Sequence, residues 1–188
     1  PDCFPTPEEY EQAFVDFLNK SKKNSVALIC SEDARARQLL TNKTLENRRL
    51  LSYGFEEGDD YHAILLDPSH SSNEFVLATQ QGGIPQLSGP FSPNLPGTHN
   101  ALNATAILST LHLLGINPQL ALGAVENFSG TERRWDIVLQ NDDLTLINDY
   151  GHHPTQLRLT LEAARQNYPN SRIIAVWEPH TFSRTQRL

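Results

Sequence analysis

Apolar and polar positions in the first forty residues predict a helix, a buried strand and a second helix. A capping pattern at Thr6 and Glu9 is followed by aromatic and aliphatic residues at helical spacing. Residues 26–30, VALIC, form a short apolar run typical of a buried strand. Ser31 then fits the N-cap of a helix that ends near Leu40. A strand followed directly by a helix is typical of the α/β class.

The middle of the chain predicts a hairpin, an irregular stretch and a buried helix. YHAILL at 61–66 and EFVLAT at 74–79 read as two strands, and the polar residues between them favour a hairpin. The stretch 80–97 is dense in Gly and Pro and is expected to be irregular. A strongly apolar helix is then predicted from about His99 to Leu114, with a shorter helix over 118–127.

The last third of the chain predicts strands on both sides of a helix. WDIVLQ at 135–140 and LTLIND at 144–149 read as strands around a polar turn. Pro154 suits the first position of a helix that runs to about Tyr168, and RIIAVW at 172–177 reads as the next strand. A strand, a helix and a strand of this length predict a parallel β-α-β unit.

Taken together, the pattern predicts an α/β fold with a boundary near residue 130. We expect one α/β domain over 1–130 and the opening of a second over 131–188.

The charge, hydropathy and cysteine content of the chain argue against several classes of protein. The 15 Lys+Arg against 22 Asp+Glu leave a net charge of −7, which argues against non-specific nucleic-acid binding. No apolar run approaches the ~20 residues that span a bilayer, so no membrane partner is expected. Only Cys3 and Cys30 are present, which favours a reducing, cytoplasmic compartment over a disulfide scaffold.

Polar side chains follow two predicted strands of the last unit. Asp149, Tyr150, His152 and His153 come after the first, and a cluster containing Glu178, His180 and Arg184 comes after the second. Ligands of open parallel sheets bind at the carboxyl ends of strands, so these groups are expected to converge on one crevice. The alternative is that His153 caps the following helix and His152 is a solvent-facing loop residue.

Two further patterns suit a nucleotide. Asn100 and Asn103 lie on one side of the predicted buried helix, beside His99, and their amides match the donors and acceptors of a purine edge. Arg133 and Arg134 could bind phosphate or carboxylate, although two surface arginines are the simpler reading. Helix capping alone would explain one Asn more easily than both.

Zinc is a competing use of the histidines. His152, His153 and His180 could supply three nitrogens, but adjacent histidines on an extended segment point apart, so no metal site is predicted. No GxSxG motif supports a serine triad.

Four stretches, in this order, resemble the Mur ligase family: PGTHNALNATA (96–106), GTERRW (130–135), DYGHHPT (149–155) and EPHTFSRT (178–185). The resemblance covers essentially the whole chain and is greatest to the members that use free L-alanine. It implies that 1–130 is the second half of a central, ATPase-type α/β domain. Residues 131–188 are then the start of a Rossmann-like C-terminal domain.

The resemblance also implies an activity, which is ATP-dependent amide formation in peptidoglycan precursor synthesis. The carboxylate of UDP-N-acetylmuramate would be phosphorylated to an acyl phosphate and then attacked by the amine of L-alanine. ATP and Mg²⁺ are the implied cofactors. The family's glycine-rich phosphate loop and Mg²⁺ ligands do not occur in this sequence, so we expect the chain alone to be inactive.

Site residues are carried over by the same resemblance. The residues implied to bind nucleotide are His99, Asn100 and Asn103 at adenine, Arg134 at phosphate and Asp149 at ribose. Those implied to surround the alanine and the forming amide are Tyr150, His152, His180 and Arg184, with His152 and His180 as the catalytic pair. His153 is expected to be structural.

The sequence departs from the family pattern at two positions. Asn148 stands where the family often has a second acid, and Thr181 where some members have an arginine. Two alternatives remain open: a ligase of the same family that recycles a muramyl tripeptide, and a non-catalytic nucleotide-binding module.

Overall fold

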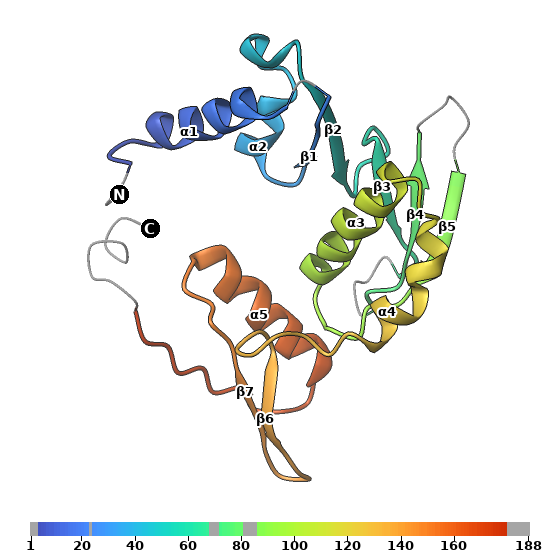
Figure 1. Ribbon diagram of the computed structural model, residues 1–188. Coiled ribbons are helices and arrows are strands. Elements are labelled where there is room, and N and C mark those ends of the chain that lie inside the picture. Colours follow the sequence, from blue (N-terminus) through green and yellow to red (C-terminus); the bar gives the residue numbers. More distant parts are fainter. Residues whose placement is uncertain (1–3, 23, 68–71, 81–85, 180–188) are drawn as a thin grey trace.

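The computed structural model describes residues 4–22, 24–67, 72–80 and 86–179 (Figure 1). The helices are α1 (Pro7–Lys20), α2 (Ala34–Leu39), α3 (Thr98–Leu113), α4 (Leu122–Asn127) and α5 (Pro154–Asn167), with 3-10 turns η1 (Lys43–Leu45) and η2 (Pro118–Ala121). The strands are β1 (Val26–Cys30), β2 (Arg49–Gly54), β3 (Tyr61–Leu65), β4 (Phe75–Thr79), β5 (Gln86–Phe91), β6 (Asp136–Gln140) and β7 (Thr145–Asn148).

A five-stranded mixed sheet organises the first unit. Its order is β1-β2-β3-β4-β5; β1, β2 and β3 are parallel, and β3, β4 and β5 are antiparallel. Helix α3 packs against this sheet at β2 and β3. The α/β class predicted from the sequence is confirmed, as is the hairpin of β3 and β4.

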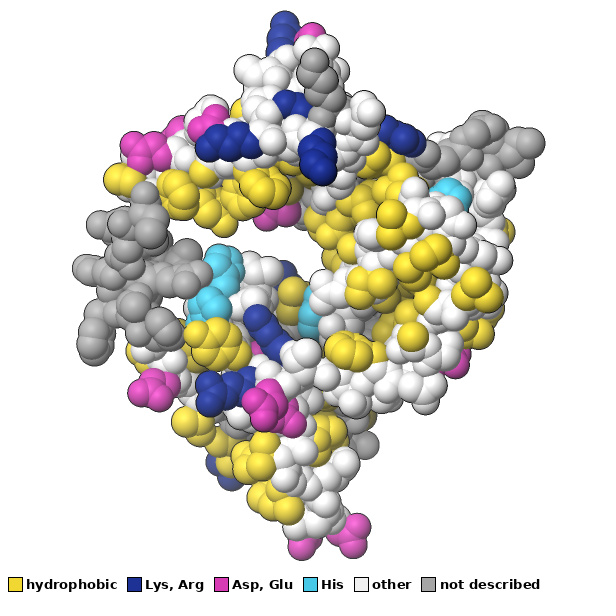
Figure 2. Space-filling view, viewed as in Figure 1, with side chains coloured by type: hydrophobic (Ala, Val, Ile, Leu, Met, Phe, Trp, Pro, Cys, Tyr) yellow, Lys and Arg dark blue, Asp and Glu magenta, His cyan; other side chains and the backbone are white. Residues whose placement is uncertain are grey.

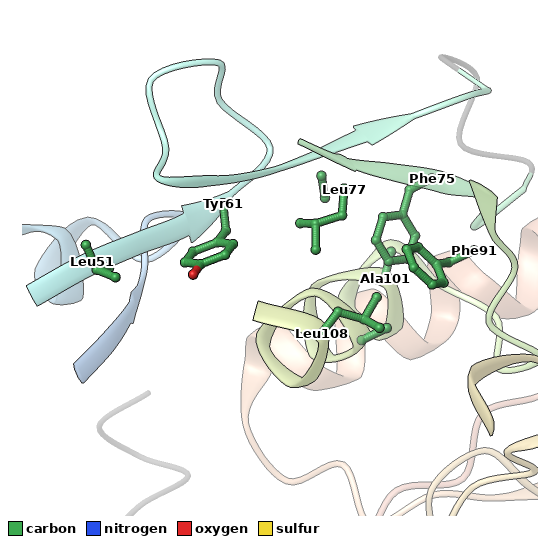
Figure 3. Close-up of a cluster of buried hydrophobic side chains, with 9 residues drawn as sticks. Leu51, Tyr61, Phe75, Leu77, Phe91, Ala101 and Leu108 are labelled. Atoms are coloured by element: carbon green, nitrogen blue, oxygen red, sulfur yellow. The ribbon is translucent and has the colours of Figure 1, made fainter. Parts of the chain in front are cut away.

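The main core lies between this sheet and α3 (Figure 3). Strand residues Tyr61, Phe75, Leu77 and Phe91 are fully buried against the α3 side chain of Leu108. The buried Tyr61 hydroxyl keeps a partner, because it lies 3.1 Å from Nδ1 of His112 on α3. Burial of the aromatic side chains is the dominant stabilising contribution here.

A smaller cluster joins α1, β1 and η1 through Val15, Leu18, Ile29 and Leu45. Another part of the α1 surface is also apolar, because hydrophobic side chains gather along this helix where it is exposed (Figure 2). Its exposed aromatic residues recur at helical spacing: Tyr10, Phe14 and Phe17. No helix among the described residues is long and apolar enough to cross a membrane.

Local signals fixed several helix starts. The Thr6 hydroxyl accepts the Glu9 amide hydrogen, as the capping pattern predicts, with a donor–acceptor distance of 3.2 Å. The predicted cap at Ser31 was wrong. Asp33 caps α2 by accepting from the amides of residues 35 and 36, while the Ser31 hydroxyl donates to buried Asp59 at 2.8 Å.

Two strands were missed by the sequence pattern. Strand β2 lies in a stretch for which no element was predicted, and β5 lies in the stretch 80–97 that was expected to be irregular. Strand β5 contains Pro90, which cannot donate a backbone hydrogen bond. It is tolerated because β5 is at the edge of the sheet, where one side of the strand needs no donor.

The second unit contains the β6–β7 hairpin and α5. The hairpin is antiparallel, and α5 begins at Pro154, as predicted. The strand predicted at 172–177 was wrong, because residues 172–179 form no strand, and the β-α-β unit predicted around α5 is therefore absent from residues 131–179. Ile174 and Val176 are 73% and 94% exposed, so this apolar segment has neither a pairing strand nor a covering layer there.

Candidate functional site

A pocket of about 470 Å³ lies where the two units meet. Its walls come from the start of α3, the turn before β6, the end of β7 and one side of α5. The lining residues are Leu95, His99, Asn100, Asn103, Phe128, Gly130, Thr131, Arg134, Trp135, Asp149, Gln156, Leu159 and Thr160. This volume is in the range of small-molecule sites, and apolar walls with a few polar groups are typical of them.

The start of α3 brings three predicted residues into this pocket, and hydrogen bonds distinguish their roles. The Asn100 side-chain NH₂ donates to the Pro96 carbonyl at 2.8 Å and lies 3.2 Å from Nε2 of His99. The Asn100 oxygen in turn lies 3.4 Å from the NH₂ of Asn103. Asn100 therefore holds His99 and Asn103, whereas Asn103 is exposed and lines the pocket, and its amide can both accept and donate a hydrogen bond.

The two ring nitrogens of His99 have different surroundings. Because Nε2 faces the Asn100 donor, the proton of the neutral imidazole belongs on Nδ1, which is buried without a hydrogen-bond partner among the described residues. Burial lowers the pKa of His99; nearby Asp149 raises it and Arg134 lowers it. Gly97 makes room for the ring, because a Cβ there would lie 2.7 Å from Nδ1.

Arg134 and Asp149 belong to two backbone segments that are joined by hydrogen bonds. The Asp149 carboxylate accepts the Trp135 amide hydrogen at 3.0 Å and the Gly151 amide hydrogen at 2.8 Å. The Tyr150 amide donates to the Arg133 carbonyl at 2.7 Å. The end of β7 thus fixes the turn that carries Arg134 beside the pocket.

Helix α5 contributes residues that the sequence did not single out. Gln156, Leu159 and Thr160 line the pocket from one side of this helix. Their spacing of three and four was visible in the sequence, but only the packing of α5 toward α3 shows which side faces inward. Leu95 and Phe128, which both belong to the first unit, supply an apolar part of the wall.

The residues predicted to surround the alanine do not lie in this pocket where the structure describes them. Tyr150 and His152 follow Asp149 but do not line the pocket; their rings pack edge to face at 5.0 Å, and Nδ1 of His152 lies 3.0 Å from the Tyr150 carbonyl. His153 caps α5 by accepting the Thr155 amide hydrogen at 3.2 Å, the structural role considered for it. The predicted His180 and Arg184 lie outside the described residues.

A metal site is not built from the described part of the chain. No group of three or more His, Cys, Asp or Glu side chains there could hold an ion. His152 and His153 are engaged with their own loop and helix start, as described above.

Family models match most of the chain. The Mur ligase middle domain matches residues 2–111, and the Mur ligase glutamate ligase domain matches residues 133–186. UDP-N-acetylmuramate–L-alanine ligases are similar over the full chain: that of Lawsonia intracellularis is 33% identical over 187 residues, and that of Syntrophomonas wolfei is 35% identical over 187 residues. The chain covers 40% and 39% of these two relatives, so it spans about two fifths of their length.

Solved structures share the fold. The UDP-N-acetylmuramate-alanine ligase of Thermotoga maritima aligns with a TM-score of 0.70 at 21% identity, covering 93% of this chain and 37% of that one. MurF of Acinetobacter baumannii aligns with a TM-score of 0.69 at 22% identity, covering 87% of this chain and 34% of that one.

Proposed function

The chain belongs to the Mur ligase family, and we propose that it is part of an ATP-dependent ligase that joins L-alanine to UDP-N-acetylmuramate. One observation supports the proposal most strongly. Five residues from three separate motifs line one pocket: His99, Asn100, Asn103, Arg134 and Asp149. The named relatives, which match over the whole chain, support the choice of substrates.

The pocket is proposed to bind the nucleoside and phosphates of ATP. Asn103 would read the base, because an amide offers an acceptor and a donor that match the amino group and a ring nitrogen of adenine. Asn100 would orient both Asn103 and His99 through the hydrogen bonds of its amide. Leu95, Phe128 and Leu159 would cover the apolar faces of the base.

The charged residues suit the rest of the nucleotide. Each Asp149 oxygen accepts one backbone hydrogen and has lone pairs left for the ribose hydroxyls. Arg134 would bind a phosphate, where its planar guanidinium can form paired, charge-assisted hydrogen bonds. The described residues form no group that could hold an ion. We propose that Mg²⁺ is held by segments of the full-length ligase that lie outside these 188 residues.

The reaction is proposed to proceed in two steps. A carboxylate oxygen of UDP-N-acetylmuramate attacks the γ-phosphorus of ATP, which releases ADP and forms an acyl phosphate. The amine of L-alanine then attacks the acyl carbon, phosphate leaves with the bonding electrons, and one proton is lost. Tyr150, His152, His180 and Arg184 are proposed to surround this second step, with His152 and His180 moving or stabilising the proton.

The test uses the full-length protein that contains this chain. Incubation with ATP, Mg²⁺ and UDP-N-acetylmuramate should release phosphate only when L-alanine is added. Release with a muramyl tripeptide in place of alanine would instead identify the recycling ligase. Release with neither would leave a non-catalytic nucleotide-binding module.

A variant pair tests the base site. Asn103→Ala should lower the preference for ATP over inosine triphosphate about tenfold, the loss expected for one paired amide contact. Asn127→Ala is the matched control, because Asn127 is an exposed helical asparagine outside the pocket. Equal preference ratios in the two variants would argue against the assigned base site.

A further inference from the structure

The turn that carries Arg134 has a backbone that residues with side chains rarely adopt. Arg133 has φ 58° and Trp135 has φ 52°, and they are the non-glycine residues with positive φ in the described part of the chain. A Cβ makes this left-handed region costly, so such a conformation persists only where the surroundings hold it. The side chain between these two residues, Arg134, lines the pocket.

Within the turn, the Arg134 amide donates to the Thr131 carbonyl at 3.1 Å and the Arg133 amide donates to Oδ2 of Asp136 at 3.5 Å. Two further hydrogen bonds join the turn to the residues that follow β7. Asp149 accepts the Trp135 amide hydrogen through Oδ2, and Tyr150 donates its amide hydrogen to the Arg133 carbonyl. The other Asp149 oxygen accepts the Gly151 amide hydrogen, which fixes the carboxylate itself. The carboxylate therefore stabilises one of the two left-handed residues directly, at Trp135.

We infer that Asp149 is a positioning residue that holds the left-handed turn at 133–135 and thereby directs Arg134 to its ligand. This inference rests on the proposed function in one respect, which is that the ligand of Arg134 is a phosphate. Asparagine cannot replace the carboxylate, because its oxygen can meet one of the two amide hydrogens while its NH₂ would face the other. The role is additional to any contact between Asp149 and ribose.

Amide hydrogen exchange of the 188-residue chain, followed by NMR, tests the turn without a ligand. The Tyr150 amide reports on it, because this amide bonds to Arg133 and not to the Asp149 side chain. Asp149→Asn should speed Tyr150 exchange at least tenfold, whereas unchanged Tyr150 exchange would overturn the inference. Adding Arg133→Gly should restore protection, since glycine adopts positive φ readily, and the matched Arg133→Ala should not. Equal effects of glycine and alanine would also overturn it.

Nucleotide binding by the full-length protein tests the consequence for Arg134. Asp149→Asn should reduce the ratio of ATP affinity to adenosine affinity about tenfold, the effect of losing a charge-assisted phosphate contact. Arg134→Ala should reduce the ratio equally, and the double variant should reduce it no further. If Asp149→Asn lowers the affinities for ATP and for adenosine by the same factor, Asp149 contacts the nucleoside alone and the positioning role is overturned. A wild-type protein that binds neither ligand would refute the proposed function, and Tyr150 exchange would still decide the role of Asp149 in the turn.

Discussion

Gly97→Ala is the substitution with the clearest structural cost near the pocket. Gly97 is the N-cap of α3 and has φ 93° and ψ 136°, a region close to that reserved for glycine. A Cβ there would lie 2.6 Å from Cε1 of His99 and 2.7 Å from Nδ1, and 3.4 Å from Cβ of Ala163 on α5. The added methyl group would therefore press on the ring that lines the pocket.

The expected loss has two parts. Forcing alanine into this conformation costs of order 1–3 kcal/mol. Displacing the His99 ring against packed neighbours adds about 1–3 kcal/mol, as for other overpacked sites. The free energy of unfolding should therefore fall by about 2–6 kcal/mol, and ATP affinity should fall with it because His99 moves.

Urea unfolding followed by circular dichroism measures this loss. Gly115→Ala is the matched control, because Gly115 also has positive φ, 76°, but a Cβ there would meet nothing within 4 Å. That control should cost only the left-handed penalty, about 1–2 kcal/mol. If Gly97→Ala is no more destabilising than Gly115→Ala, the close approach of Gly97 to His99 does not contribute to stability, contrary to the prediction.

Three further predictions concern stability. Gly54→Ala should cost about 2–4 kcal/mol in urea unfolding, because a Cβ would lie 2.0 Å from Oγ of Ser31, whereas Gly58→Ala, with nothing within 4 Å, should be nearly neutral. Leu108→Ala should cost about 2–5 kcal/mol, since this side chain is fully buried in the main core; a loss under ~1 kcal/mol would contradict that packing. Burial lowers the pKa of folded His99, so the unfolded chain binds the proton more tightly, and stability should fall as pH drops below about 6.5. His99→Gln should reduce the difference between urea midpoints at about pH 7.5 and about pH 5.5, and an unchanged difference would contradict the assigned burial.

Elements with strong local signals were predictable from the sequence. The cap at Thr6, the proline at the start of α5 and the apolar run of α3 each act within a few residues, and the structure has all three elements. The resemblance to the Mur ligases also came from the sequence, because ordered motifs need no three-dimensional information. The family models confirm it.

Strand pairing was less predictable, because a strand is stabilised mainly by neighbours far away in sequence. Strand β5 forms in a Gly- and Pro-rich stretch because β4 pairs with it. The apolar run 172–177 has a typical strand sequence yet forms none, since no described strand pairs with it. The cap predicted at Ser31 was wrong for the same reason, because its hydroxyl donates to Asp59, which is distant in sequence, while Asp33 caps α2.

For the candidate site, too, the sequence determined some features and the tertiary structure determined others. The sequence by itself identified the chemistry: two amides at a helix start, an arginine after a glycine and an acid after a strand. Only the tertiary structure decided that Asn103 faces the pocket while Asn100 holds its neighbours, and that Asp149 accepts hydrogens from the turn beside Arg134. Side-chain chemistry is fixed residue by residue, whereas the direction of a hydrogen bond depends on which distant backbone groups packing brings within reach.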